Sequence, residues 1–273
     1  MDFDNAAANN DDGSLVFGTS YGTVGLFITE GGLSSKYAYG AGALAAGSDY
    51  SSPADIEWGI NIDSYNNIQY HTPADLLPLG ITAKIGYAPN LSDGEGASAK
   101  SKGTVETKAD GDDATQFRID ATPIAGLTVG ADYSSISGTL TATKYAKESA
   151  SAYAKYVAGP ITVGYAKNGN QPTKTTGATY TYETDAYGIK FAVNENLTIS
   201  YGEEKSTKRT SSTLDAKAVR TAATETDYEI EHIQAAYVIG GATVGIAIAD
   251  GKNVNYTPGR QDKQTIFSLA MAF

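Results

Sequence analysis

One unit recurs along the whole chain: two segments in which apolar side chains alternate with polar or small ones, joined by a short turn and followed by a longer polar stretch. Gly, Pro or Asn stands at nearly every short turn, as β-hairpins require. Because successive side chains of a strand point to opposite faces, each segment forms a strand with one apolar face. The pattern predicts thirteen antiparallel strands in hairpin order, in units spanning 14–29, 67–88, 114–136, 150–167, 178–204 and 228–250, with a last strand at about 263–273.

The connections between hairpins are long and polar, while the turns within hairpins are short. Residues 91–113 and 206–226, for example, are rich in Ser, Thr, Lys, Asp and Gly. Short turns on one side and long loops on the other are typical of transmembrane β-barrels, whereas a soluble sandwich has no reason to sort its loops in this way. No apolar run approaches the roughly 20 residues that a membrane helix needs. The sequence therefore excludes a helical membrane protein and favours an all-β, antiparallel transmembrane β-barrel.

The apolar rows of several strands end on tyrosine at the long-loop side. One such row reads Leu127, Val129, Ala131 and Tyr133. Three other rows end in the same way, on Tyr87, Tyr165 and Tyr201. Tyrosine has an apolar ring and a polar tip, and it is enriched where a membrane meets water. The pattern predicts an aromatic girdle at one membrane interface; in a soluble sandwich the same apolar faces would form the core.

The last strand carries large apolar side chains at Phe267, Leu269, Met271 and Phe273, with small residues between them. A terminal Phe on such a strand resembles the assembly signal of bacterial outer-membrane barrels. Residues 1–12 are polar and acidic and contain no signal peptide. Ordinary bacterial barrels have an even number of strands. We therefore expect either an odd number of further strands upstream of the given sequence, or an unusual odd-numbered barrel, and an export signal that was removed or lies upstream.

Three short motifs, taken in order, resemble the trimeric general porins of Gram-negative bacteria. GSLVFGTSYGTVGLF at 13–27 is similar to the turn and strand before the constriction loop of those porins, and YNNIQYHTP at 65–73 is similar to the strand after it. IFSLAMAF at 266–273 resembles their terminal strand. The resemblance implies a single porin β-barrel domain over 1–273, within a barrel of about 16 strands, with residues 30–66 as the constriction loop inserted into the pore. It also implies a homotrimer in the bacterial outer membrane, in contact with outer-membrane lipids.

Residues that carry catalytic or metal-binding chemistry are scarce. The chain has two His and no Cys, and it has no Gly-rich phosphate loop between a strand and a helix. A net charge of −11 argues against nucleic acid as a partner. We expect no enzymatic activity, no cofactor and no bound metal.

The function that the sequence supports best is a water-filled channel for passive diffusion of ions and small hydrophilic solutes. The charges at the narrowest point of such a pore set its selectivity, and the resemblance implies an acidic loop that faces a basic wall. The only base of the loop is Lys36, and its predicted constriction acids are Asp49, Asp55, Glu57 and Asp63. The predicted basic residues on inward strand faces are Lys84 and Arg118 at the constriction and Lys155 and Lys190 elsewhere in the lumen.

A mild preference for cations follows from this charge balance in the loop. The alternative reading is that the loop acids are ordinary solvated charges. Two other classes of function remain open. A substrate-specific channel, for a sugar or a phosphate, would need a basic ring or aromatic side chains in the lumen, and the loop offers Tyr37, Tyr39, Tyr50 and Trp58. A non-channel adhesin or β-rich surface module would remain soluble without detergent.

Overall fold

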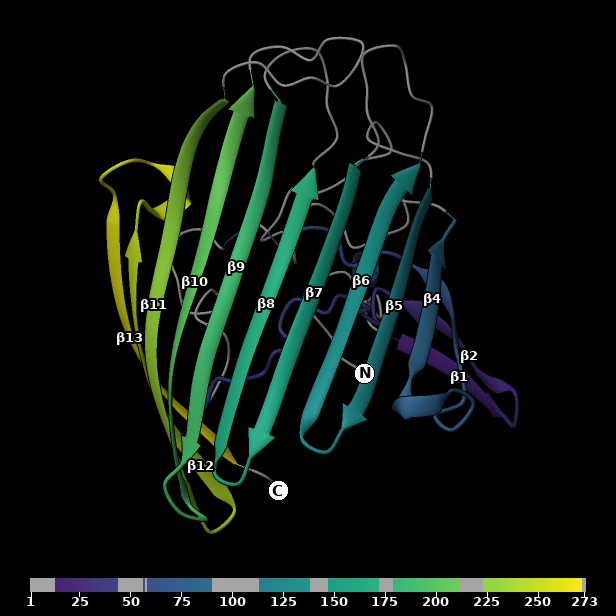
Figure 1. Cartoon of the computed structure of the whole chain (residues 1–273), viewed down its shortest axis with the longest axis horizontal. Helices are drawn as coiled ribbons and strands as arrows, with labels where there is room; N and C mark the ends of the chain where they lie inside the picture. Colours follow the sequence, from purple (N-terminus) through teal and green to yellow (C-terminus); the bar gives the residue numbers. More distant parts are fainter. Residues whose placement is uncertain are drawn as a thin grey trace, which may run out of the picture.

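The computed structural model describes residues 13–43, 56, 58–89, 113–137, 147–171, 179–211 and 223–271. These residues form one continuous sheet of thirteen strands, each hydrogen-bonded antiparallel to the next in chain order (Figure 1). The predicted number of strands and the all-β, antiparallel class are confirmed. β1 and β13 are the edges of the sheet, and within the described residues they are not paired with each other.

The strands grow longer toward the middle and the end of the chain. They are β1 (Gly13–Thr19), β2 (Gly22–Ile28), β3 (Asn67–His71), β4 (Thr82–Ala88), β5 (Asp113–Ile124), β6 (Leu127–Ser137), β7 (Lys147–Ala158), β8 (Ile161–Gln171), β9 (Thr179–Ala192), β10 (Leu197–Ser211), β11 (Ala223–Ile239), β12 (Ala242–Lys252) and β13 (Gln261–Met271). Three short 3-10 turns lie between strands: η2 (Ile62–Ser64), η3 (Pro78–Gly80) and η5 (Val254–Tyr256). No helix among the described residues is long and apolar enough to cross a membrane.

Two of the short turns show how the sequence closes its hairpins. Gly126, between β5 and β6, has a φ of 82°, and a Cβ built on it would lie 2.4 Å from the carbonyl oxygen of Val157. Only glycine meets both conditions without strain. Between β9 and β10, the Asn194 side chain accepts hydrogen bonds from the backbone N–H groups of Asn196 and Leu197, each at 2.9 Å. Such local side-chain bonds are the reason that asparagine favours turns.

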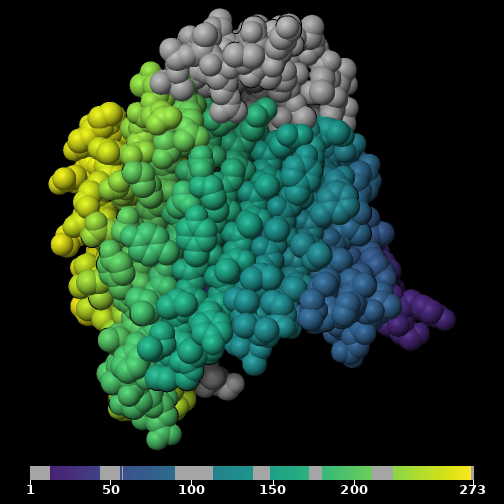
Figure 2. All heavy atoms as spheres, in the orientation of Figure 1, coloured from purple at the N-terminus to yellow at the C-terminus, as the bar shows by residue number. Residues whose placement is uncertain are grey.

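The outer face of the sheet is apolar, and the apolar rows of its strands end on tyrosines at the long-loop side, as predicted. Figure 2 shows this outer face over β4–β11. The hydroxyls of three girdle tyrosines donate hydrogen bonds to carboxylates on the next strand: Tyr133 to Glu148 at 3.0 Å, Tyr165 to Asp185, and Tyr187 to Glu203. The tyrosine rings thus lie at the edge of the apolar outer face, and their hydroxyls lie against charged side chains on the long-loop side. This arrangement suits an interface between lipid and water.

Strands β9, β10 and β11 continue beyond this girdle. The polar stretch 206–226 was expected to be a loop, but β10 extends to Ser211 and β11 begins at Ala223. Ion pairs between neighbouring strands accompany the extension, including Arg209 with Glu183 at 2.7 Å and with Glu225 at 2.8 Å. Cross-strand pairs of opposite charge stabilise a sheet as apolar pairs do, so a charged sequence can remain a strand.

Candidate pore constriction

The segment between β2 and β3 is called here the inserted segment (30–66), and its described residues lie on the inner face of the sheet. Its described parts pack against inward-facing positions from β4 to β10. Three inward glycines allow the close approach: a Cβ built on Gly86 would lie 2.9 Å from Ile62, one on Gly164 would lie 2.2 Å from the carbonyl oxygen of Tyr39, and one on Gly188 would lie 3.1 Å from the Cβ of Ala41. A larger residue at Gly164 would displace the segment, because the atom that it overlaps belongs to the backbone.

One carboxylate on β6 anchors the start of the segment. Asp132 Oδ1 accepts hydrogen bonds from both the backbone N–H and the hydroxyl of Ser35, each at 2.6 Å. Its other oxygen accepts a hydrogen bond from the Gln116 amide at 3.2 Å. Asp132 is buried, and a buried carboxylate is tolerated where such donors satisfy it.

A second anchor is formed by an ion pair on β5. Arg118 donates to both carboxylate oxygens of Asp120, at 2.7 Å and 3.0 Å, and also to the carbonyl oxygen of Ser34 at 3.1 Å. The Tyr153 hydroxyl donates to Asp120 at 2.7 Å. Arg118 lies on the inner face, as predicted. Its charge is balanced by Asp120, and its guanidinium holds the backbone of the inserted segment.

Polar side chains of the wall also bind the backbone of three other described residues of the segment. The N–H of Ile62 donates to Gln116 at 2.9 Å, the N–H of Ile60 donates to Ser149 at 3.0 Å, and the N–H of Ala43 donates to Ser200 at 2.7 Å. These bonds satisfy backbone groups that the loop would otherwise leave unpaired inside the molecule. They hold the segment to strands that lie far apart in the sheet.

Hydrogen bonds within the inserted segment also connect its two described parts. The Asn61 side chain accepts the backbone N–H groups of Leu33 and Ser34, at 3.0 Å and 3.1 Å, and donates to Asp63 at 2.6 Å. Its two described arms are thereby joined to each other. Asp63 is half-buried in η2 and is the one predicted constriction acid that the structure describes.

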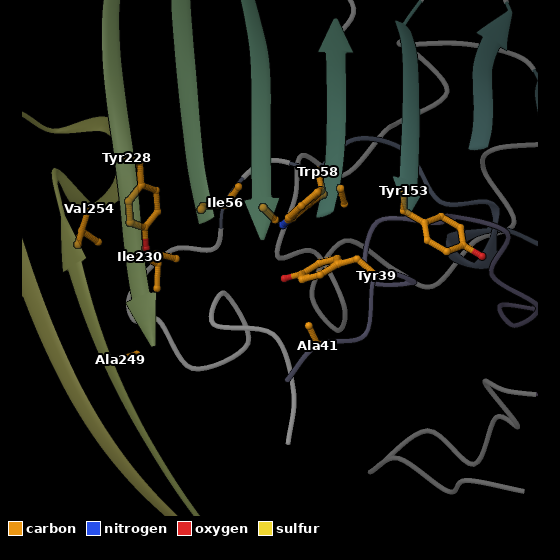
Figure 3. Packing of buried hydrophobic residues seen from close by; sticks show 11 residues of the cluster. Tyr39, Ala41, Ile56, Trp58, Tyr153, Tyr228, Ile230, Ala249 and Val254 are labelled. Carbon is orange, nitrogen blue, oxygen red and sulfur yellow. The ribbon is translucent and has the colours of Figure 1, made fainter. Parts of the chain in front are cut away.

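Aromatic side chains fill the space between the segment and the wall. Tyr37 and Trp58 meet edge to face, with ring centroids 5.6 Å apart, and the Tyr39 hydroxyl donates to the buried Glu204 on β10 at 3.3 Å. Figure 3 shows Tyr39 and Trp58 close together on the inner side of the strands. Tyr228, Ile230 and Val254 belong to the same buried cluster. Two of the aromatic residues that the sequence offered for a substrate-specific channel are buried in packing: Tyr39 and Trp58 are 4% and 3% exposed.

The predicted basic residues lie on the inner face at different places. Lys84 and Arg118 are direct cross-strand neighbours on β4 and β5. Lys155 lies beside the segment, because a Cβ built on Gly40 would be 3.7 Å from its Cδ. Lys190 is the cross-strand neighbour of Thr162 and of Ser200. The structure thus brings Lys84 and Arg118 together and sets the other two apart.

Four predicted site residues lie outside the described residues: Asp49, Asp55, Glu57 and the assembly residue Phe273. Tyr50 also lies outside them. Their roles stay predictions. Within the described part of the chain, no group of three His, Asp or Glu side chains could hold a metal ion.

Sequence reasoning missed three residues that fix the site: Asp120, Asp132 and Tyr153. The alternation of β5 and β6 places both acids on the inner face, so that much of the signal was present. Their role depends on contacts with Ser35 and Arg118, and the Ser35–Asp132 contact joins residues 97 positions apart. No local pattern carries such a contact.

The comparisons with known proteins point to one fold. No protein-family model matches the chain, and no curated protein matches it. Among solved structures, a loop-L8 deletion mutant of OmpT, an outer-membrane protein of Vibrio cholerae, is 13% identical with a TM-score of 0.60, over 95% of this chain and 78% of that one. An anion-selective porin from Comamonas acidovorans is 11% identical with a TM-score of 0.60, over 96% and 77%. A further porin is 16% identical with a TM-score of 0.60, over 95% and 81%.

The chain has a porin-like outer-membrane β-barrel fold. At such low identity the likeness concerns the fold alone. The neighbours of this fold are outer-membrane proteins, which agrees with the location predicted from the tyrosine girdle and the apolar outer face.

Proposed function

We propose that the chain forms a water-filled channel in the bacterial outer membrane, through which ions and small hydrophilic solutes diffuse passively. The inserted segment is the single observation that supports this function best. A long connection is bound to the inner face by Ser35, Ile60 and Ile62, and it occupies space that would otherwise be open lumen. A fixed obstacle inside a polar barrel narrows the passage without closing it.

The narrowed passage would sort solutes by size and charge. Lys84, Lys155 and Lys190 would face the lumen from the wall, and Asp63 together with the acids at 49, 55 and 57 would face it from the segment. A narrow passage with low-dielectric walls focuses such a field, so a few charges outweigh the rest of the surface. No chemical step, cofactor or catalytic residue enters this function, and the protein would act as a channel and not as an enzyme.

The full assembly is part of the same proposal. The chain would be a single barrel domain over 1–273, in a barrel of about 16 strands that associates as a homotrimer. The apolar outer face, with exposed side chains such as Ile119, Ile189 and Val244, would contact outer-membrane lipids or a neighbouring subunit. Apolar patches of this extent mark membrane or protein contacts.

Conductance across a planar bilayer tests the function. The purified protein in detergent should insert and give discrete, ohmic current steps, and liposomes that contain it should become permeable to small sugars. A protein that stays monodisperse without detergent, or that inserts and carries no current, would contradict the proposal.

A substrate-specific channel is the second candidate function. Tyr39 and Trp58 of the inserted segment lend it little support, since they are buried in packing. Three tyrosines around Lys208, at the long-loop end of the wall, favour it instead.

A further inference from the structure

A lysine near the long-loop end of the inner wall lies among three tyrosine rings. Lys208 Nζ on β10 is 4.3 Å from the ring centroid of Tyr180 and 5.7 Å from those of Tyr182 and Tyr256. Tyr180 and Tyr182 belong to β9, and Tyr256 belongs to η5, the turn between β12 and β13. We call these four residues the tyrosine–lysine cluster. An ammonium at these distances from aromatic faces is held by cation–π attraction.

The rings are themselves held in place. Tyr256 packs on Tyr182, with ring centroids 5.2 Å apart, and edge to face on Tyr228, at 5.7 Å. Its hydroxyl shares a hydrogen bond of 2.7 Å with Ser206, which also accepts one from Thr184 at 2.8 Å. Two strands and a turn thus fix the cluster. Tyr180 remains 40% exposed, so its ring can be reached from the lumen.

The two faces of the sheet differ in charge at these strand ends. The positions that share the inner face with Lys208 carry hydroxyls and rings, among them Thr184, Ser206, Thr226 and Tyr228. The acids of the same stretch, Glu183, Glu225, Asp227 and Glu229, take the alternate positions on the outer face. The next inward carboxylate on β10 is Glu204, four positions away and buried against Tyr39.

Lys208 therefore differs from the basic residues around it. Lys167, Lys205 and Arg209 each pair with carboxylates on the outer face. Within the described residues no carboxylate is paired with Lys208, and its ammonium lies over the Tyr180 ring and near the rings of Tyr182 and Tyr256. Aromatic rings position an ammonium without cancelling its charge, so Lys208 presents a fixed positive charge to the lumen.

We propose that the tyrosine–lysine cluster is a binding subsite for a saccharide that carries a carboxylate or phosphate group. Tyrosine rings offer flat apolar faces to the C–H face of a sugar, the surrounding hydroxyls can exchange hydrogen bonds with its hydroxyls, and the Lys208 ammonium pairs with the anionic group. A cationic ligand would meet the resident ammonium and be repelled. Because the cluster faces the lumen, the ligand is a solute on its way through the channel and not a lipid headgroup of the surrounding membrane.

This inference rests on the proposed channel and adds the class of solute that it recognises. Calorimetric titration of the detergent-solubilised protein with galacturonate, galactose and inorganic phosphate tests it, with bilayer conductance recorded on the same preparation. We expect galacturonate to bind, galactose and inorganic phosphate to bind at least about tenfold more weakly, and galacturonate to cause brief current blocks.

Matched variants distinguish binding by the tyrosine–lysine cluster from a general effect of removing a positive charge. Lys208→Met keeps most of the side-chain stem and removes the ammonium, and Tyr180→Leu removes the most exposed ring. Each should weaken galacturonate binding by about tenfold or more. Lys205→Met, on the outer face of the same strand and paired with Asp227 at 2.7 Å, should leave it unchanged. Conductance should persist in all three variants.

Three results would overturn the inference while leaving the channel intact: no galacturonate binding to a conducting protein, equal binding of galactose, or binding that Lys208→Met and Tyr180→Leu do not weaken. Equal binding of inorganic phosphate with no effect of Tyr180→Leu would also overturn it, since the rings would then play no part. Loss of conductance in the unmodified protein would instead contradict the proposed function.

Discussion

At the scale of single residues, inward glycines decide how closely the inserted segment approaches the wall. Gly164, Gly188 and Gly202 are cross-strand neighbours on β8, β9 and β10. The first two lie under Tyr39 and Ala41 of the segment. The missing side chains of Gly164 and Gly188 leave room for the segment, whereas the space over Gly202 is taken by the His232 side chain. Glycine in a strand often marks such a close backbone approach.

Gly164→Ala should push the segment away from the wall and into the lumen. The new Cβ would lie 2.2 Å from the carbonyl oxygen of Tyr39, and backbone must move to relieve that overlap. Overpacking of this kind costs about 1–3 kcal/mol. We expect a lower thermal midpoint and a smaller single-channel conductance. Gly169→Ala on the same strand has open space around the new Cβ and is the control; equal conductance of the two variants would show that the segment does not narrow the pore at Tyr39.

The sequence was sufficient to predict which residues of these strands face inward, but not which distant residues they contact. Alternation with period two placed Lys84 and Arg118 inward, because it is a property of the backbone. The same alternation puts Asp120 beside Arg118 on one face of β5, so this local ion pair was within reach of the sequence. It could not show that Asp132 binds Ser35 or that Arg118 binds the carbonyl oxygen of Ser34, because those contacts depend on the path of a long connection.

At the scale of elements, ion pairs between neighbouring strands accompany the extension of β9–β11 beyond the girdle, and Lys167 of β8 takes part in one of them. Lys167 pairs with Glu183 at 2.5 Å, Arg209 pairs with Glu183 and Glu225, and Lys205 pairs with Asp227 at 2.7 Å. These side chains are partly exposed and lie beyond the tyrosine hydroxyls. The apolar pattern ends at the girdle, so the sequence placed the end of β10 too early and the start of β11 too late, whereas the predicted start of β9 at 178 is one residue from the observed Thr179.

Arg209→Met should loosen the outer ends of β9–β11 without affecting transport. The side chain is 38% exposed, and exposed pairs contribute about 0.2–1 kcal/mol each and are screened by salt. We expect a loss of unfolding free energy below about 2 kcal/mol at low salt, largely gone near ~1 M salt, with unchanged conductance. Thermal unfolding in a salt series measures it, with Lys263→Met as the control, since that lysine has one longer contact of 3.6 Å to Asp250. A loss that does not change with salt would mean that packing and not charge holds these ends.

At the scale of the whole molecule, strand number, strand order and the two-faced character of the sheet follow from the sequence. Each is the sum of local hairpins, and the structure bears them out from β1 to β13. The enclosed path of the inserted segment follows from no local rule. It depends on packing of Tyr39 and Trp58 against strands distant in the chain.

The chain end belongs to this scale, because it concerns how a barrel forms. Phe273→Ala should reduce the amount of assembled protein in outer-membrane fractions much more than it lowers the thermal stability of protein already assembled. A terminal side chain generally contributes little packing, whereas a terminal Phe resembles the signal that marks outer-membrane barrels for insertion. The amount of folded protein in outer-membrane fractions measures assembly, and the thermal midpoint of the purified barrel measures stability, so the two effects can be told apart. Normal assembly of the variant would contradict the expectation.

The central claim is that the inner face of the sheet lines an aqueous passage. The chain contains no cysteine, so Lys84→Cys on the inner face and Ile85→Cys on the outer face can each be probed alone. The decisive measurement is single-channel current during addition of a bulky, charged methanethiosulfonate. We predict a stepwise fall in current for Lys84→Cys and none for Ile85→Cys or the unmodified protein. Unchanged current through Lys84→Cys channels that mass spectrometry shows to be labelled would contradict the claim.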